Sequence, residues 1–170
     1  GSVNPVFLLP RALAERPEAI AQGLCASATL GGGQFCTKPG LIFGIRGESF
    51  VRFVQALGAA MAAAPPATML HHGIAQAYAA GIERLRRTPG VRAIAEGAQP
   101  GASKGAHGRA AVFATDIGAY KANPSLAEEV FGPCALAVEG ACGGCLRGAM
   151  EGLSGQLTIS FHAAGDDLAE

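Results

Sequence analysis

The residues of this sequence best suited to nucleophilic chemistry are its cysteines, and Cys36 has the most unusual surroundings. It belongs to the segment GGGQFCTKPG, residues 31–40, in which three glycines precede the cysteine and a Pro-Gly pair follows it. Glycines permit backbone conformations closed to other residues, and a Pro-Gly pair indicates a tight connection. A thiol on such a loop is accessible to substrate. We therefore interpret Cys36 as a candidate nucleophile, with burial as a small apolar side chain as the alternative.

The other cysteines favour different interpretations. Cys25 falls inside an Ala-rich helical segment and Cys134 inside an apolar strand, so both are expected in the core. Cys142 and Cys145 form a CGGC segment, which has the spacing of redox pairs and of half a zinc site. Neither a second CxxC nor a nearby His pair completes a zinc site, and a redox pair is expected near the start of a βαβ unit rather than this late in the chain. A glycine turn with incidental thiols is therefore the favoured interpretation, and no metal site is predicted.

Several other kinds of site are excluded by the absence of their motifs. The GGGQFC segment lacks the Gly-Lys-Ser/Thr that closes a phosphate-binding loop. No GxGxxG follows a predicted strand, so we do not expect this chain to carry its own nucleotide-binding fold. The pair His71-His72 follows a Pro-rich stretch at a helix start and is interpreted as an exposed helix cap.

Composition limits the classes of partner. The chain has 170 residues, of which 49% are hydrophobic and 15% charged, and its 13 basic and 13 acidic residues cancel. These values predict one globular domain, with no basic stripe for nucleic acid and no apolar run long enough to cross a membrane. Five cysteines without a framework spacing favour a reducing cytoplasm.

Hydrophobic periodicity predicts an α/β domain built around a mostly parallel sheet, because short strands alternate with helices. The strands are expected at residues 3–9, 41–45, 91–95, 110–115, 134–138 and 157–161. The helices are expected at residues 15–30, 49–64, 73–87 and 145–152, with a short helical turn at 116–120 and a turn between strands at 99–108. Residues 165–170 are interpreted as the first turn of a helix that does not continue, so we expect an excised piece of a longer protein.

Two segments together resemble the signatures of a known family. GQFCTKPG, residues 33–40, is similar to the catalytic-cysteine signature of the aldehyde dehydrogenases, and EEVFGP, residues 128–133, is similar to their second signature at the expected distance downstream. SVNPVFLLP, residues 2–10, resembles the branch acting on 2,5-dioxovalerate (α-ketoglutarate semialdehyde) and the related NADP-dependent fatty aldehyde dehydrogenases. LTISFHAAGDDLAE, residues 157–170, resembles the closing strand and helix start of the family.

The resemblance implies a three-layer αβα domain and a covalent mechanism. In the family, a thiolate attacks the aldehyde to give a thiohemiacetal, hydride leaves to the nicotinamide, and water hydrolyses the resulting thioester. Cys36 matches the nucleophile, and its backbone N–H would form half of the oxyanion hole. Glu129 matches the residue that binds the nicotinamide ribose, and Phe131 the one that packs beside the nicotinamide. Gln34 and Phe35 match positions that line the substrate tunnel.

The resemblance also implies that residues 1–170 are a single catalytic domain of a longer NAD- or NADP-dependent enzyme. The Rossmann domain, the general-base glutamate and the oligomerisation segment of the family have no counterpart in this chain. The expected partners are an aldehyde substrate, an oxo-acid semialdehyde above all, and the Rossmann domain of a homo-oligomeric parent. The isolated chain is expected to be inactive. A non-catalytic scaffold domain, or a redox or metal-binding protein based on CGGC, remains the alternative function.

Overall fold

The fold is organised around a six-stranded sheet. The computed structural model describes residues 1–99, 105–153 and 155–168. All pairings in the sheet are parallel except that of the edge strand β4 with β6. In spatial order the strands are β4 (Arg92–Glu96), β6 (Ala111–Asp116), β7 (Cys134–Gly140), β2 (Leu41–Ile45), β1 (Val6–Leu8) and β8 (Ser160–His162).

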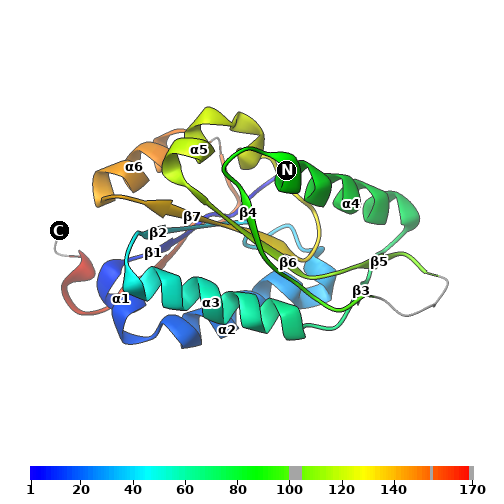
Figure 1. Cartoon of the computed structure of the whole chain (residues 1–170), viewed down its shortest axis with the longest axis horizontal. Coiled ribbons are helices and arrows are strands. Elements are labelled where there is room, and N and C mark those ends of the chain that lie inside the picture. Colours follow the sequence, from blue (N-terminus) through cyan, green and yellow to red (C-terminus); the bar gives the residue numbers. More distant parts are fainter. Residues whose placement is uncertain (100–104, 154, 169–170) are drawn as a thin grey trace.

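Helices cover both faces of this sheet, as Figure 1 shows. On one face lie α1 (Pro10–Glu15), α2 (Pro17–Thr29) and α3 (Glu48–Ala63), and on the other lie α4 (His72–Arg87), α5 (Ile117–Ala122) and α6 (Gly143–Glu151). Short connections complete the fold: the 3-10 turns η1 (Leu30–Gly33), η2 (Pro124–Ala127) and η3 (Gly165–Leu168), and a small hairpin of β3 (Ala67–Thr68) with β5 (His107–Gly108). The predicted three-layer α/β fold is therefore confirmed.

The two halves of the core follow from the alternation of side chains along each strand. In β6, Val112 and Ala114 pack toward α2 and α3, whereas Phe113 packs toward α4, α5 and α6. Neighbouring strands repeat the pattern, and the rings of Phe7 and Phe43 stack with centroids 5.0 Å apart. Because both faces are covered, these strands are apolar on both sides, as their continuous hydrophobic runs indicate.

Most predicted strands and helices agree with the structure, and the main differences lie near prolines. The strand predicted at 3–9 is shorter, because Asn4 adopts a left-handed conformation with φ of 45° and β1 begins only after Pro5. The helix predicted at 15–30 is interrupted at Arg16, because the proline that follows disfavours the α conformation of this residue. Pro10 does not simply end the strand but begins α1, where its missing N–H costs nothing.

The remaining boundaries differ by at most three residues. The last strand was predicted at 157–161 and is observed as β8, residues 160–162. His71 is the N-cap of α4 and accepts a hydrogen bond from the Ile74 N–H, so its interpretation as a helix cap is confirmed. Of the turn predicted at 99–108, residues 100–104 lie outside the described residues and residues 107–108 form β5. Within the described part of the chain, none of the helices combines the length and the apolar character needed to cross a membrane.

Candidate active site

The candidate site lies at the amino-terminal edge of the parallel sheet. A hollow of about 430 Å³ is lined there by segments that immediately precede β1, β2, β7 and β8. The residues that line it are Gly1, Ser2, Cys36, Glu129, Phe131, Gly155, Gln156 and Leu157. In open α/β sheets a ligand usually binds at the opposite, carboxyl edge. The present hollow is therefore a site to which loops before the strands contribute.

Cys36 lies on the loop between η1 and β2, and it is exposed. Its carbonyl accepts a hydrogen bond of 2.9 Å from the side-chain amide of Asn4. Among the described residues, none accepts a hydrogen bond from the backbone N–H of Cys36. The loop thus presents an accessible thiol next to a backbone donor that is not engaged within the described structure, which is the pairing that acyl-transfer chemistry requires.

The glycines before Cys36 bring the loop against the EEVFGP segment. Gly33 has a φ of 66°, and a Cβ on it would lie 2.2 Å from the carbonyl carbon of Gly132. A side chain at Gly33 would therefore force the two segments apart, besides straining the backbone. Because Glu129 and Phe131 belong to the segment that Gly33 touches, the glycine sets their distance from Cys36.

Lys38 connects the cysteine loop to the EEVFGP segment and the start of β7 through hydrogen bonds of its buried side chain. Its side chain is 3% exposed, and its ammonium donates hydrogen bonds of 3.1 Å to the Val130 carbonyl and 2.9 Å to the Cys134 carbonyl. Burial lowers the pKa of this amine, partly opposed by Cys134 and Glu129. A cation two residues from Cys36 could favour its thiolate, but the Lys38 ammonium is directed to these carbonyls. Its observed contacts give it a structural role.

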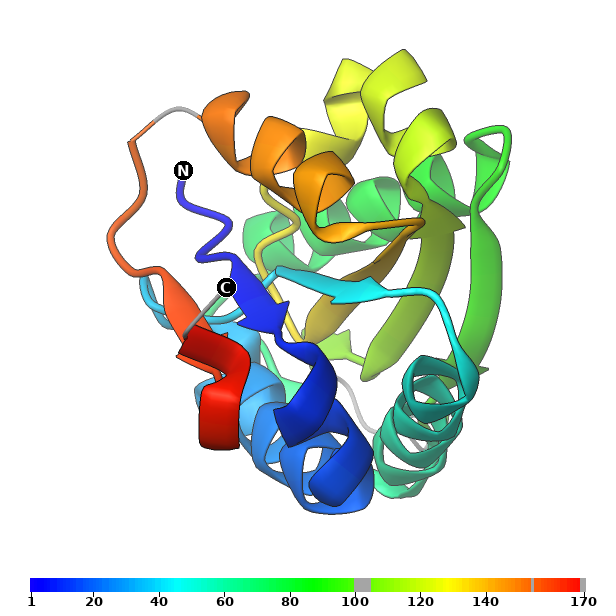
Figure 2. The same cartoon turned by 90° about the vertical axis from the view of Figure 1, so that its left-hand side faces the viewer.

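Sequence reasoning missed Asn4, whose side chain holds the cysteine loop. Asn4 is 2% exposed, and its amide nitrogen donates to the carbonyls of Cys36 and Lys38 at 2.9 and 3.0 Å. Its side-chain oxygen accepts from the Thr158 N–H, and Gln156 accepts from the Asn4 N–H. Figure 2 shows the N-terminal residues beside the segment that leads into β8. The available signal was an asparagine, which tolerates the left-handed conformation, immediately before a proline.

The structure brings together only some of the predicted site residues. Cys36, Glu129 and Phe131 line the same hollow, with the last two half-buried. Gln34 does not line this hollow. Its side-chain amide nitrogen donates to the carbonyls of Gly31 and Thr68, and its side-chain oxygen accepts from the Leu70 N–H. These hydrogen bonds connect the cysteine loop to the region of β3. Phe35 is 48% exposed and its ring lies over Gly31. A substrate-binding role for Gln34 and Phe35 stays a prediction.

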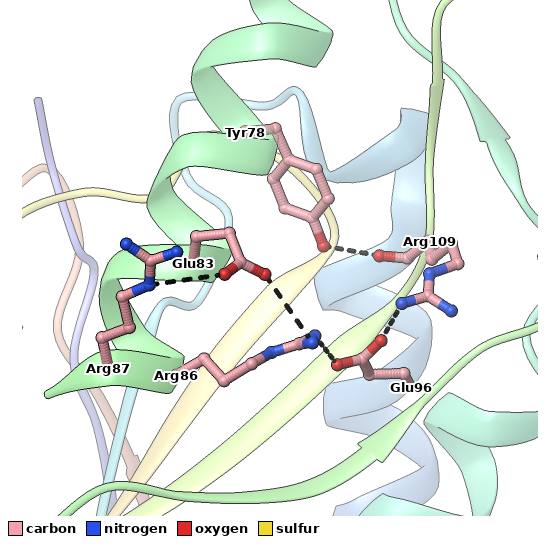
Figure 3. Close-up of polar contacts among 6 residues, drawn as sticks. All are labelled: Tyr78, Glu83, Arg86, Arg87, Glu96 and Arg109. Carbon is pink, nitrogen blue, oxygen red and sulfur yellow. Dashed lines mark hydrogen bonds and ion pairs between the residues drawn. The ribbon is translucent and has the colours of Figure 1, made fainter.

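Tyr78, from α4, supports the EEVFGP turn from the other side. A Cβ on Gly132 would lie 2.3 Å from the Tyr78 ring, so the glycine allows the turn to pack on it. The hydroxyl donates to the carbonyl of Arg109, the Pro133 carbonyl lies 3.2 Å away as its alternative acceptor, and burial raises the pKa of this phenol. Figure 3 shows the polar cluster beside it, in which Glu96 pairs with both Arg86 and Arg109. These residues line a second hollow, and their pairings balance much of the charge in it.

Comparison with known proteins finds curated relatives that are similar to nearly the whole chain. No protein-family model matches the chain. The alpha-ketoglutaric semialdehyde dehydrogenase 2 of Azospirillum brasilense is 42% identical over 166 residues, which are 98% of this chain and 31% of that protein. The alpha-ketoglutaric semialdehyde dehydrogenase of Acinetobacter baylyi is 39% identical over 170 residues, 99% of this chain and 32% of that protein. The chain thus spans about a third of the length of the curated relatives it matches.

Solved structures share the fold. The methylmalonate-semialdehyde dehydrogenase of Oceanimonas doudoroffii matches with a TM-score of 0.79 over 99% of this chain and 36% of that one. At 15% sequence identity this likeness concerns the fold alone. The sequence match to the two curated relatives, by contrast, extends over nearly every residue of the chain and includes both signature segments. The chain is thus similar, over nearly its whole length, to about a third of two curated semialdehyde dehydrogenases, and it shares the fold of part of a further semialdehyde dehydrogenase.

Proposed function

We propose that this chain is the cysteine-bearing part of an NAD(P)-dependent aldehyde dehydrogenase that oxidises an oxo-acid semialdehyde to the corresponding acid. The observation that carries the proposal is the hollow around which Cys36, Glu129 and Phe131 gather. The names of the two curated relatives support α-ketoglutaric semialdehyde as the substrate.

Cys36 is the proposed nucleophile. Its thiolate attacks the aldehyde carbon, and the carbonyl oxygen becomes an oxyanion that the Cys36 N–H stabilises. The exposure of the thiol and the backbone donor beside it both support this role. Once the thiohemiacetal carbon has lost a hydride, which a bound nicotinamide would accept, Cys36 carries the acyl group as a thioester until water releases the acid. We assign no general base within this chain, because the Glu128 carboxylate is paired with Arg84 at 2.7 Å and Glu129 has another proposed role.

The residues around the hollow fit a nicotinamide cofactor. The half-buried Glu129 carboxylate is an acceptor suited to ribose hydroxyls, and the Phe131 ring offers an apolar face for a flat heteroaromatic ring. The chemistry that such a cofactor supplies when bound is acceptance of a hydride. Glu129 and Phe131 would hold it beside Cys36, whether it is NAD or NADP.

This chain is proposed to work as one domain of a longer protein. A Rossmann domain of the parent would present the nicotinamide at the hollow, and we expect the parent to be a homo-oligomer. The five cysteines, all free in the structure, support a cytoplasmic location. The chain on its own is expected to show no aldehyde-dependent formation of NADH or NADPH. Robust turnover by this chain would contradict the proposal that a second domain must present the nicotinamide.

The test is production of NADH or NADPH by a longer form that carries a nicotinamide-binding domain ahead of Gly1. We expect turnover with α-ketoglutaric semialdehyde and a higher kcat/KM than with an uncharged aldehyde of similar length. Cys36→Ser should reduce kcat by at least about 10³-fold, as loss of a nucleophile does elsewhere. The matched control is Cys25→Ser, at a buried thiol in α2, which should retain activity within a few-fold. Activity that survives in Cys36→Ser would overturn the assignment.

A further inference from the structure

The CGGC segment, residues 142–145, lies where a strand is followed by a helix. It follows β7 directly and opens α6, and the chain then returns to the same sheet as β8, parallel to β7. The segment therefore stands at the strand-to-helix junction of a βαβ unit, which is where a redox pair is expected. The prediction that CGGC lies too late in the chain for such a unit is therefore wrong. The junction lies at the carboxyl edge of the sheet, opposite the edge that carries Cys36.

The two thiols of this segment face each other. The sulfur atoms of Cys142 and Cys145 are 2.8 Å apart. Cys142 is the N-cap residue of α6, and the Cys145 N–H donates to its carbonyl at 3.1 Å, so the first turn of the helix fixes the pair. A disulfide needs sulfur atoms about 2.05 Å apart, so bond formation requires a shift of under about 1 Å.

The surroundings make Cys142 the more reactive of the two. It is exposed, whereas Cys145 is half-buried. The hydrogen bond with the Cys145 thiol lowers the pKa of Cys142, helped by the backbone N–H groups of Cys145 and Gly144 and by the charge of Lys121. Lys121 reaches over α6, where its ammonium lies 3.2 Å from the position of a Cβ on Gly148. Thiolates stabilised at a helix start and near a cation are the ones that react with oxidants.

We infer that Cys142 and Cys145 are a redox-active dithiol that hydrogen peroxide converts to an intramolecular disulfide. The Cys142 thiolate attacks one oxygen of the peroxide, an S–O bond forms as the O–O bond breaks, and the hydroxide that leaves is protonated to water, which leaves a sulfenic acid on Cys142. The Cys145 thiol then attacks that sulfur, the S–O bond breaks, and a second water leaves. Two thiols lose two electrons and two protons, and one peroxide is reduced to two waters. A dithiol reductant reverses the change by exchange.

Other uses of the pair have less support within the described residues. No group of three or more His, Cys, Asp or Glu side chains there could hold a metal ion, so Cys142 and Cys145 lack further ligands for zinc. Cys25 and Cys134 are buried and do not compete for oxidant. Cys36 is exposed, but at the opposite edge of the sheet. The nearest partner for an oxidised Cys142 is therefore Cys145.

The experiment treats the reduced protein with stoichiometric hydrogen peroxide, alkylates the remaining thiols, and maps the peptides by mass spectrometry. The peptide that holds Cys142 and Cys145 should lose both alkylation sites together and the mass of two hydrogen atoms, and dithiothreitol should restore both sites. In Cys145→Ser the reaction should stop at a sulfenic acid on Cys142, which dimedone captures. Cys25→Ser is the control and should leave disulfide formation unchanged.

Two results would overturn the inference. One is that Cys142 and Cys145 both remain available for alkylation at peroxide concentrations that oxidise Cys36. The other is that the two thiols oxidise separately, so that Cys145→Ser does not change the product at Cys142. Because these readouts do not involve turnover, they stand apart from the test of the proposed function.

Discussion

Replacing Asn4 by alanine tests how the cysteine loop is held. Asn4 is almost completely buried and donates from one amide nitrogen to two carbonyls of that loop, those of Cys36 and Lys38. It also adopts a left-handed conformation, with φ of 45°. Alanine removes both donors and tolerates this conformation poorly, so Asn4→Ala should destabilise the protein and loosen the loop around Cys36.

The size of the effect follows from these contacts. A buried carbonyl that loses its partner costs about 1–3 kcal/mol, and two carbonyls are affected. The left-handed backbone costs a residue such as alanine about 1 kcal/mol more. The sum is about 3–7 kcal/mol, a large part of the stability of a domain of this size. Glycine also lacks the side-chain amide, but it adopts the left-handed conformation without strain. Asn4→Gly should therefore cost about 1 kcal/mol less than Asn4→Ala.

The assay is urea unfolding followed by circular dichroism, together with the rate of Cys36 alkylation in the folded protein. The matched control is Asn123→Ala, which removes one amide donor to the Ala119 carbonyl at the end of α5. We expect it to cost about 1 kcal/mol and to leave the Cys36 rate unchanged. If Asn4→Ala costs no more than Asn123→Ala and leaves the alkylation of Cys36 unaltered, the reasoning about the loop is wrong.

Two further substitutions address the contact between the signature segments. Gly33→Ala should cost several kcal/mol in calorimetric unfolding, because its Cβ would meet the Gly132 backbone, whereas Gly23→Ala has open space in α2 and should gain up to about 1 kcal/mol; equal stability of the two variants would contradict the contact. Lys38 has a pKa lowered by burial from 10.5, so its contribution to stability grows as pH rises toward that value and declines as pH falls through the folded pKa. The unfolding free energy of wild type relative to Lys38→Met should therefore increase from neutral to alkaline pH, and a constant difference would show that the amine is not desolvated.

Local pattern predicted most of the fold. The spacing of Phe50, Phe53, Leu57 and Met61 predicted α3 to within one residue, and the apolar run at 41–45 matched β2. Such patterns succeed because they reflect which face of an element is buried. The resemblance in two short segments also predicted that Cys36, Glu129 and Phe131 belong together, and the structure places them around one hollow.

The parts that sequence reasoning missed depend on contacts between distant segments. Asn4 looks like a polar residue in an apolar strand, and only its contacts with the cysteine loop explain its burial. The charge of Lys38 does not reveal its acceptors, which are carbonyls more than 90 residues away along the chain. The position of Cys142 and Cys145 required the order of the strands, which no local pattern specifies. Buried polar groups have partners that tertiary structure alone reveals.

The most direct test of the central claim compares alkylation of Cys36 and Cys25 by iodoacetamide in one sample, with and without α-ketoglutaric semialdehyde. The exposed Cys36 should be labelled much faster than Cys25, whose thiol pKa is raised by burial. The aldehyde should slow labelling of Cys36 alone, because a thiohemiacetal occupies the nucleophile. If Cys36 is labelled no faster than Cys25, or if the aldehyde does not protect it, Cys36 is not the nucleophile of this site.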